Sequence, residues 1–204
     1  EILRLKSSVT IAGSHGKTTT TSLISCILEE GKLDPTVING GIINTYKTNA
    51  KLGKGDWIIA EADESDGSFT YLPSTICLIN NIDPEHLDFY GTFEKLKKAF
   101  IKYTDNVPFY GFISICADHE NLKTLIKKIT NKKIITFGLT KSAGISAKNI
   151  KVIEKNEVFY TQFDLIINIK EYDEMKNIIV PILGDHNLRN TLGAISIGLN
   201  LGVK

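Results

Sequence analysis

The sequence predicts an α/β fold in which helices flank a mostly parallel β-sheet and a small antiparallel β meander is appended. Three observations support this prediction. Short apolar runs alternate with segments of helical periodicity over the first two-thirds of the chain. A glycine-rich turn joins the first of these runs to the first helical segment. Beyond about residue 143, strand-like stretches follow one another and are separated by polar turns.

Buried strands and an amphipathic helix open the chain. The runs Val9–Ala12, Trp57–Ala60 and Thr75–Ile79 do not alternate polar with apolar residues, which is typical of strands buried on both faces. Between the first two runs, apolar residues recur at helical spacing from Thr18 to Glu30, and Gly31 then predicts the end of that helix.

The same alternation continues to about residue 138. Thr92 is expected to cap a helix that carries apolar and aromatic residues on one face, namely Leu96, Ala99, Phe100 and Tyr103. A strand follows at Phe112–Ile115, a helix at Leu122–Ile129 and a strand at Ile134–Phe137. Because strand–helix–strand units of this length pair their strands in parallel, we expect helices on both faces of the sheet.

The pattern changes in the last third of the chain. The stretches Ile145–Ile153, Val158–Ile169 and Tyr172–Leu183 predict an antiparallel meander over about residues 143–183, either as an appended sheet or as an edge extension. A last helix is expected over Asn187–Leu201, where apolar residues share one face.

Composition excludes several classes of protein. The 204 residues include 42% hydrophobic and 23% charged residues, which excludes wholesale disorder, and a formal net charge of +1 disfavours a dedicated nucleic-acid binder. No apolar run approaches the roughly 20 residues of a membrane span. Cys26, Cys77 and Cys116 lie apart in apolar segments, so we expect buried, reduced thiols in a cytosolic protein.

The turn Gly13–Thr18, with the letters GSHGKT, is typical of a phosphate-binding loop in a P-loop-type sheet. Free N–H groups of the loop and of the following helix would point at one anion. Lys17 would reach the β- and γ-phosphates, and the Thr18 hydroxyl would ligate Mg²⁺. The full motif has another glycine where this chain has Ile11. The alternative, a glycine turn beside a surface lysine, is disfavoured by the strand before it and the helix after it.

Two further strands are expected to end in chemically active residues. Glu61–Asp66 contains four carboxylates at the carboxyl end of a parallel strand, where such sheets bind ligands and where a carboxylate would hold Mg²⁺. A solvated acidic loop is the alternative. His86 follows the next strand, and its imidazole could ligate a second metal or contact the transferring phosphate.

Polar residues also open the last predicted helix. His186, Asn187 and Asn190 lie within its first turns. Helix capping explains Asn187 by itself. The amides could also read an adenine edge, because Asn pairs with adenine N6 and N7 in other contexts.

Four motifs in this order resemble the central domain of the Mur ligase family, over essentially the whole chain. They are residues 12–21, 61–69, 81–88 and 186–190. The likeness is greatest to members that act on UDP-N-acetylmuramate and L-alanine. It implies a cytoplasmic, ATP- and Mg²⁺-dependent amide ligation in bacterial peptidoglycan precursor synthesis, through an acyl phosphate, with neither nucleic acid nor a membrane span involved.

The resemblance also implies roles for individual residues. The catalytic residues would be Lys17, Glu61 and His86. The residues that hold metal would be Thr18, Glu61 and His86. The residues that contact ATP would be Gly13, Ser14, His15, Gly16, Lys17, Thr18, Thr19, His186, Asn187 and Asn190. The residues near the muramyl substrate would be Asn49, Asp63 and Ser65.

This sequence departs from the family pattern in two respects. Several members carry a carbamylated lysine on the helix after the histidine, but counting from His86 places that position near Phe100 or Ile101, with Lys98 and Lys102 out of register. The family also has three domains. We therefore expect residues 1–204 to be the central domain, which would be inactive in isolation, with a nucleotide-sugar domain before it and a further domain after it.

Other functions remain open on the sequence alone. One is a murein-tripeptide recycling ligase or another Mur-type ligase, including one similar to folylpolyglutamate synthase. A different class is a P-loop regulatory module that binds nucleotide without chemistry, which would not need the extra carboxylates or His86.

Overall fold

A ten-stranded sheet forms the centre of the computed structural model, which describes residues 2–43, 47–168 and 174–203. The strands, in the order in which they lie in the sheet, are β10 Met175–Val180, β9 Val158–Ile167, β8 Ile145–Lys155, β7 Ile134–Gly138, β6 Phe112–Cys116, β5 Ile76–Ile79, β1 Ser7–Ala12, β4 Trp57–Glu61, β2 Thr36–Ile43 and β3 Thr48–Lys51. From β2 through to β8 neighbouring strands are parallel, whereas β3, β9 and β10 pair antiparallel at the two edges.

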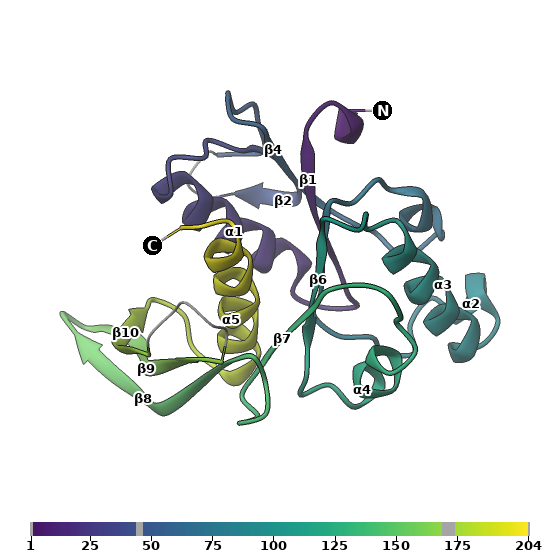
Figure 1. Cartoon of the computed structure of the whole chain (residues 1–204). Helices are drawn as coiled ribbons and strands as arrows, with labels where there is room; N and C mark the ends of the chain where they lie inside the picture. Colours follow the sequence, from purple (N-terminus) through teal and green to yellow (C-terminus); the bar gives the residue numbers. More distant parts are fainter. Residues whose placement is uncertain (1, 44–46, 169–173, 204) are drawn as a thin grey trace.

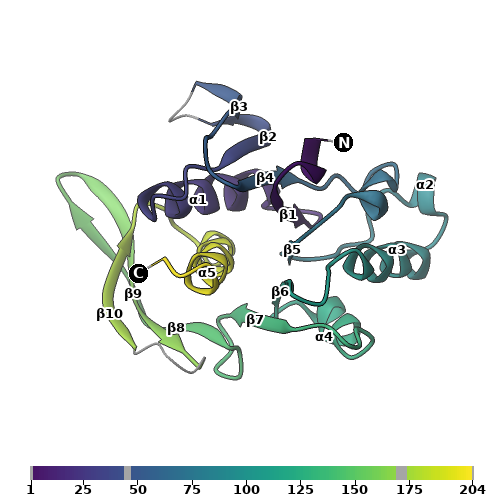
Figure 2. The same cartoon turned by 45° about the horizontal axis from the view of Figure 1, so that its top comes forward.

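Helices cover both faces of this sheet, as Figures 1 and 2 show. They are α1 Lys17–Glu30, α2 Leu87–Tyr90, α3 Phe93–Asp105, α4 Glu120–Ile126 and α5 Asp185–Asn200, with short 3₁₀ turns η1 Ile2–Arg4 and η2 Ser68–Tyr71. Helices α1 and α5 lie side by side on one face, and the strands from β1 to β10 curve around α5. Helices α2, α3 and α4 lie on the other face. The predicted α/β class is thereby confirmed.

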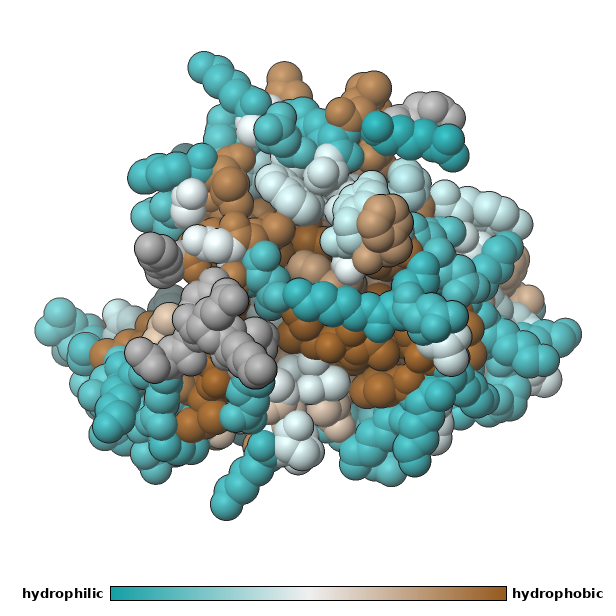
Figure 3. All heavy atoms as spheres, viewed as in Figure 1, coloured by the Kyte–Doolittle hydropathy of each residue, from teal (hydrophilic) through white to brown (hydrophobic). Residues whose placement is uncertain are grey.

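Burial on both faces explains why β1, β5 and β6 carry no charged side chain. Every residue of β5 and β6 is buried, as are five of the six in β1. Hydrophilic side chains occupy the periphery in Figure 3, and apolar atoms are visible across its centre. Among the described residues, no helix has the length and apolar character to cross a bilayer.

Local signals set the helix bounds. The Thr92 hydroxyl accepts a hydrogen bond from Lys95 N at 3.3 Å, so the predicted cap of α3 is confirmed. Helix α4 ends at Ile126, three residues before the predicted end. The meander is an extension of the main sheet, because β8 pairs in parallel with β7 and antiparallel with β9. The second predicted strand ends at residue 169 and the third begins at residue 172, and residues 169–173 lie outside the described residues.

Two strands and one thiol differ from the expectation. Strands β2 and β3 were not predicted, because Asn-Gly-Gly interrupts the apolar pattern of β2 and the side chains of β3 are mostly exposed. Cys77 and Cys116 are buried as expected, but the expectation for Cys26 was wrong. Cys26 is exposed because α1 turns Ile24 and Leu28 toward the core and leaves Cys26 on its outer surface.

Aromatic side chains fill the core between α3 and the sheet. The Phe100 ring meets the Phe69 ring edge-on, with 5.1 Å between centroids, and both side chains are fully buried. Tyr103 packs beside them, and its hydroxyl bonds to Thr10 of β1. Helix α3 is therefore held to the sheet by apolar area and by a polar contact at the end of Tyr103.

We expect Phe100→Ala to lower the free energy of unfolding by about 3–5 kcal/mol, since it leaves a cavity in this aromatic cluster. Phe109→Ala is the matched control, because that ring is 93% exposed, and it should change stability by less than about 0.5 kcal/mol. Urea unfolding followed by circular dichroism measures both values. Equal losses in the two variants would contradict the assigned core.

Candidate functional site

The loops that follow β1, β4, β5 and β6 meet at the carboxyl edge of the sheet. This is the edge at which open α/β sheets place their ligands. The glycine-rich turn follows β1 and leads into α1 at Lys17. Gly16 has φ of +82°, and a Cβ there would lie 2.7 Å from Asn190 Oδ1 of α5. Glycine at this position therefore permits both the left-handed turn and the close approach of α5.

The segment after β5 fixes the shape of the glycine-rich turn. Asn81 Oδ1 accepts a hydrogen bond from His15 N at 2.8 Å, and Asn81 Nδ2 donates to His15 O at 3.1 Å. The Ser14 hydroxyl accepts from Asp83 N at 2.9 Å. Asn81 thus holds both the N–H and the carbonyl group of His15, so protein contacts fix the shape of the turn.

A buried ion pair holds the lysine of the turn. Lys17 Nζ donates to Gly13 O at 2.7 Å and to Glu64 Oε2 at 2.9 Å. Glu64 is only 1% exposed, and Lys17 is 18% exposed. A carboxylate this deeply buried needs a partner, because transfer of an unpaired charge from water is costly. The ammonium group is therefore positioned over the turn by an acid from the loop after β4.

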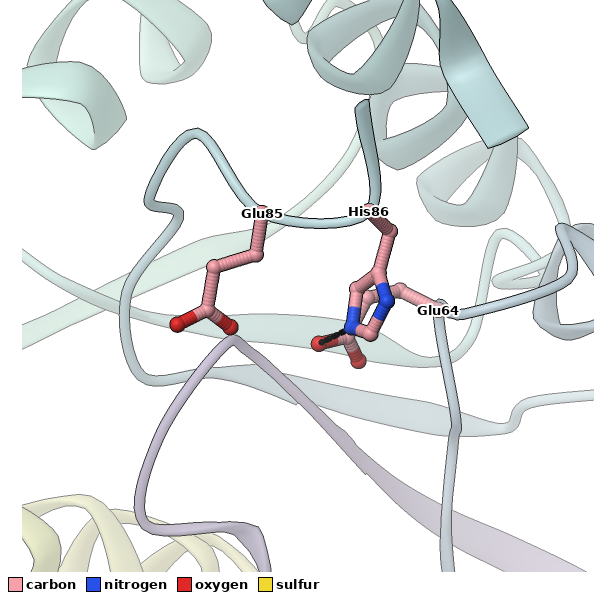
Figure 4. A group of neighbouring side chains, drawn as sticks. All are labelled: Glu64, Glu85 and His86. Carbon is pink, nitrogen blue, oxygen red and sulfur yellow. Dashed lines mark ion pairs between the residues drawn. The ribbon is translucent and has the colours of Figure 1, made fainter. Parts of the chain in front are cut away.

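Glu64 also belongs to a group that has the composition of a metal site. One ligand atom each from Glu64, Glu85 and His86 lies within 4.8 Å of the others. Figure 4 shows the three side chains directed toward a common space from two loops. His86 Nε2 lies 3.8 Å from Glu64 Oε1. Two carboxylates and an imidazole suit a divalent cation.

The predicted metal residue Glu61 lies at the end of β4. Its Oε1 atom is buried and has no hydrogen-bond partner within the part of the chain that the structure describes. Its Oε2 atom faces β2, where a Cβ on Gly40 would lie 2.8 Å away. The next residue, Gly41, lies beside the Thr18 methyl group. A buried carboxylate oxygen without a donor fits a hard cation such as Mg²⁺.

A cleft of about 350 Å³ extends from the glycine-rich turn toward β6 and β7. Its lining residues are His15, Gly16, Asn80, Asn81, Asp83, Cys116, Asp118, His119, Phe137, His186, Arg189 and Asn190. His15, Gly16, His186 and Asn190 are among the predicted ATP-contacting residues. The structure therefore brings the turn after β1 and the start of α5 to one cavity.

Asp118 joins three elements at the far wall of this cleft. Its carboxylate accepts hydrogen bonds from Leu139 N at 2.7 Å, Thr140 N at 2.9 Å and Arg189 Nε at 2.8 Å. Burial by itself would raise the pKa of Asp118, but these hydrogen bonds and the Arg189 charge lower it below its ordinary 3.8. The charged carboxylate thus links the end of β6 to the turn after β7 and to α5.

Histidine side chains surround the loop after β5. His15 Nε2 lies 3.6 Å from Asp83 Oδ2 and 3.4 Å from Glu85 Oε1. His119 Nε2 lies 3.3 Å from Asp83 Oδ1. Acidic side chains of the loop after β5 therefore lie next to imidazole groups at the mouth of the cleft.

Some predicted residues lie elsewhere. Asn187 Nδ2 donates to Leu183 O at 2.9 Å, and this half-buried side chain is outside the cleft lining. Asp63 Oδ1 accepts from Ser65 N at 3.0 Å within its own loop. Asn49 is exposed on β3 at the edge of the sheet. Thr19, on α1, is half-buried behind the turn.

Helix α3 carries Phe100 and Ile101 at the position that was counted from His86 for a carbamylated lysine. Phe100 is fully buried and Ile101 packs partly against the core. Lys98 and Lys102 line a different cleft, and Lys102 lies over the Tyr71 ring. The lysines that neighbour the counted position are thus directed away from the Glu64, Glu85 and His86 group.

Sequence reasoning did not assign roles to several residues of this site. The quoted motifs contain Glu64, Glu85 and Asn81 but assign a role to none of them, and Asn80 lies one residue before the third motif. Asp118 and His119 follow β6 directly, so the rule that polar residues at the carboxyl end of a parallel strand reach the ligand edge could have identified them. Arg189 had no such signal.

The comparisons with known proteins agree with this geometry. Residues 11–198 match the Mur ligase middle domain. The chain is 45% identical over 205 residues to a UDP-N-acetylmuramate–L-alanine ligase of Phenylobacterium zucineum and 48% identical over 206 residues to one of Rhodospirillum rubrum. Each alignment covers 100% of this chain and 42% of the relative, so the chain spans about two-fifths of their length.

Solved structures give the same fold. A UDP-N-acetylmuramate–alanine ligase of Thermotoga maritima has a TM-score of 0.79 at 26% identity, over 97% of this chain and 42% of that one. UDP-N-acetylmuramate:L-alanyl-gamma-D-glutamyl-meso-diaminopimelate ligase from Neisseria meningitides also has a TM-score of 0.79, at 22% identity, over 100% of this chain and 64% of that one. The second likeness concerns the fold alone.

We expect Asp118→Asn to lower stability by about 1–3 kcal/mol at neutral pH, because it weakens three hydrogen bonds to a charged group. Since the folded-state pKa is depressed, this contribution is complete at neutral pH and is lost as pH falls through that pKa, below 3.8. Urea unfolding of the two proteins should therefore give converging stabilities at acid pH. Asp105→Asn, at an exposed position, serves as the control. A stability difference between the wild type and Asp118→Asn that stays the same from neutral to acid pH would contradict the assigned Asp118–Arg189 pair.

Proposed function

The chain belongs to the Mur ligase family, and on that premise we propose that residues 1–204 are the ATP-binding central domain of a ligase that joins L-alanine to UDP-N-acetylmuramate. The relatives at 43–48% identity carry that name, which favours L-alanine over a murein tripeptide. In this proposal a nucleotide-sugar domain and a further domain complete the cytoplasmic enzyme. The reaction transfers the γ-phosphoryl group of ATP to the substrate carboxylate, and the amine of L-alanine then displaces phosphate from the acyl phosphate.

The observation that supports nucleotide binding most directly is the position of Lys17. Its ammonium lies over the turn, between Gly13 O and the buried Glu64 carboxylate. Backbone N–H groups at the start of α1 and the partial positive charge of that helix end attract phosphate. Because Asn81 already holds the turn at His15, little ordering entropy remains to be lost when a phosphate enters.

The metal has two sets of candidate ligands. Glu61 and the Thr18 hydroxyl would hold Mg²⁺ beside the turn, and Glu64, Glu85 and His86 would hold a second ion. Bound there, Mg²⁺ supplies positive charge that offsets the charge on the γ-phosphoryl oxygens. Lys17 would orient the same phosphate from the side of α1. This number of acidic groups favours phosphoryl transfer over a regulatory module that only binds nucleotide.

We expect Lys17→Ala to weaken Mg-ATP binding at least about tenfold, because one charge-assisted contact to phosphate is worth roughly 1.5–3 kcal/mol. Isothermal titration calorimetry on the 204-residue chain measures the affinity. Lys155→Ala, an exposed lysine at the end of β8, is the matched control and should bind as the wild type does.

Removal of Lys17 also leaves Glu64 buried without its partner, so Lys17→Ala could lose binding merely by unfolding. The double variant Lys17→Ala/Glu64→Gln avoids that unpaired charge. It should be more stable than Lys17→Ala in urea yet equally deficient in Mg-ATP binding. Wild-type affinity in the double variant would overturn the phosphate-loop assignment.

The ligation itself is tested on a full-length protein that contains this chain. It should consume ATP with L-alanine and UDP-N-acetylmuramate and should be inactive with murein tripeptide or glutamate as the amine. Borohydride added during turnover should reduce the acyl phosphate and leave the corresponding alcohol. Turnover with tripeptide instead of L-alanine would show a recycling ligase, and nucleotide binding without any product would favour the regulatory class.

A further inference from the structure

The cleft ends at one of the two arginines in the chain. Among the 24 basic residues only Arg4 and Arg189 are arginines. Arg4 is exposed in η1, whereas Arg189 lies on the first turns of α5 and lines the cleft. Asn190, its neighbour in the chain, contacts the phosphate-loop glycine Gly16. The family resemblance implies an ATP contact for His186 and Asn190 on this helix but none for Arg189.

Strand order indicates which part of a nucleotide would reach Arg189. The glycine-rich turn follows β1, and β6 and β7 are the second and third strands from β1 on one side. At about 4.8 Å per strand, their ends lie roughly 10 and 14 Å from the turn. On the opposite side of β1 the neighbouring strand ends in Glu61 and is followed by the buried Glu64. If the phosphates lie on the turn, the space that remains for the nucleoside is therefore the cleft on the β6–β7 side.

The guanidinium of Arg189 is fixed by one edge only. Its Nε donates to Asp118 Oδ2 at 2.8 Å, and Asp118 is itself held by the N–H groups of Leu139 and Thr140. The side chain is 34% exposed. Its Nη atoms make no hydrogen bond within the described part of the chain. A planar group with its free donors in a cavity is suited to an aromatic base, which it can stack on or donate to.

We propose that Arg189 is a nucleoside-contacting residue, which lets the site bind ATP more tightly than its triphosphate alone, and that Asp118 is the residue that positions it. This inference rests on the proposed function, because it needs phosphates on the glycine-rich turn. The contact lies at the opposite end of the nucleotide from the reacting γ-phosphate. Arg189 thus contributes to affinity and to the choice of nucleotide.

A contact between Arg189 and the nucleoside can be distinguished from a structural role by comparing two ligands that both carry a triphosphate, only one of which has a nucleoside. Mg-ATP and Mg-tripolyphosphate are titrated calorimetrically into the chain, Arg189→Ala, Arg189→Lys and, as matched control, Arg4→Ala. Arg189→Ala should bind Mg-ATP about tenfold more weakly, the loss of roughly one hydrogen bond, and should bind Mg-tripolyphosphate as before. Arg189→Lys should show a similar loss for ATP, because lysine keeps the charge but not the planar fork. Arg4→Ala should leave the affinity for both ligands unchanged.

Several outcomes would overturn the proposal. Equal losses for both ligands in Arg189→Ala would mean that the residue acts through long-range charge or through the shape of the turn. Full ATP affinity in Arg189→Ala or Arg189→Lys would mean that the guanidinium does not meet the nucleoside. If Arg189→Ala unfolds, as judged by urea denaturation, the comparison of the two ligands in Arg189→Lys decides. Absence of binding of both ligands by the wild type would instead refute the proposed function itself.

Discussion

The pairing of Glu64 with Lys17 is the interaction on which the site depends. Glu64 is nearly inaccessible to water, so its charge is tolerable only where a cation or several donors meet it. Lys17 supplies that cation from the glycine-rich turn. Tyr90 of α2 donates its hydroxyl to the Glu64 carbonyl. Burial and the nearby Glu64 charge raise the pKa of Tyr90 to about 12, so the hydroxyl remains a donor at neutral pH.

These contacts link three segments that are far apart in the sequence. The loop after β4 carries Glu64, α1 begins with Lys17, and the loop that leads into α2 carries His86. Each alone would be a polar, solvated turn. Together they surround one buried carboxylate, whose contact with Lys17 sets the orientation of the lysine. A buried ion pair is weak evidence for stability but good evidence that two elements have a required relative position.

The sequence predicts much of this arrangement because local sequence signals determine where the strands and loops lie. Apolar runs mark β1, β4, β5, β6 and β7, and the rule that parallel strands present their carboxyl ends at one edge gathers the motifs there. The features that the sequence did not predict depend on tertiary contacts. Strand β2 contains Asn-Gly-Gly, and part of the reason is that the Glu61 side chain lies against Gly40, a contact that no periodicity reveals. That Glu64 is the acid that pairs with Lys17 likewise depends on how the loop turns after β4.

Because arginine is scarce, the two ends of the cleft at the carboxyl edge carry different kinds of cationic group. Bidentate guanidinium clamps commonly hold phosphate in proteins, yet the proposed phosphate end has none and would rely on backbone N–H groups, Lys17 and acidic residues suited to a cation. The single arginine of the edge lies at the other end of the cleft, where Asp118 fixes its plane. At the proposed phosphate end, Lys17 presents a compact positive charge that Glu64 holds in place, which suits a group whose charge changes during transfer. A planar arginine held at one edge is better suited to a rigid, flat base that does not react.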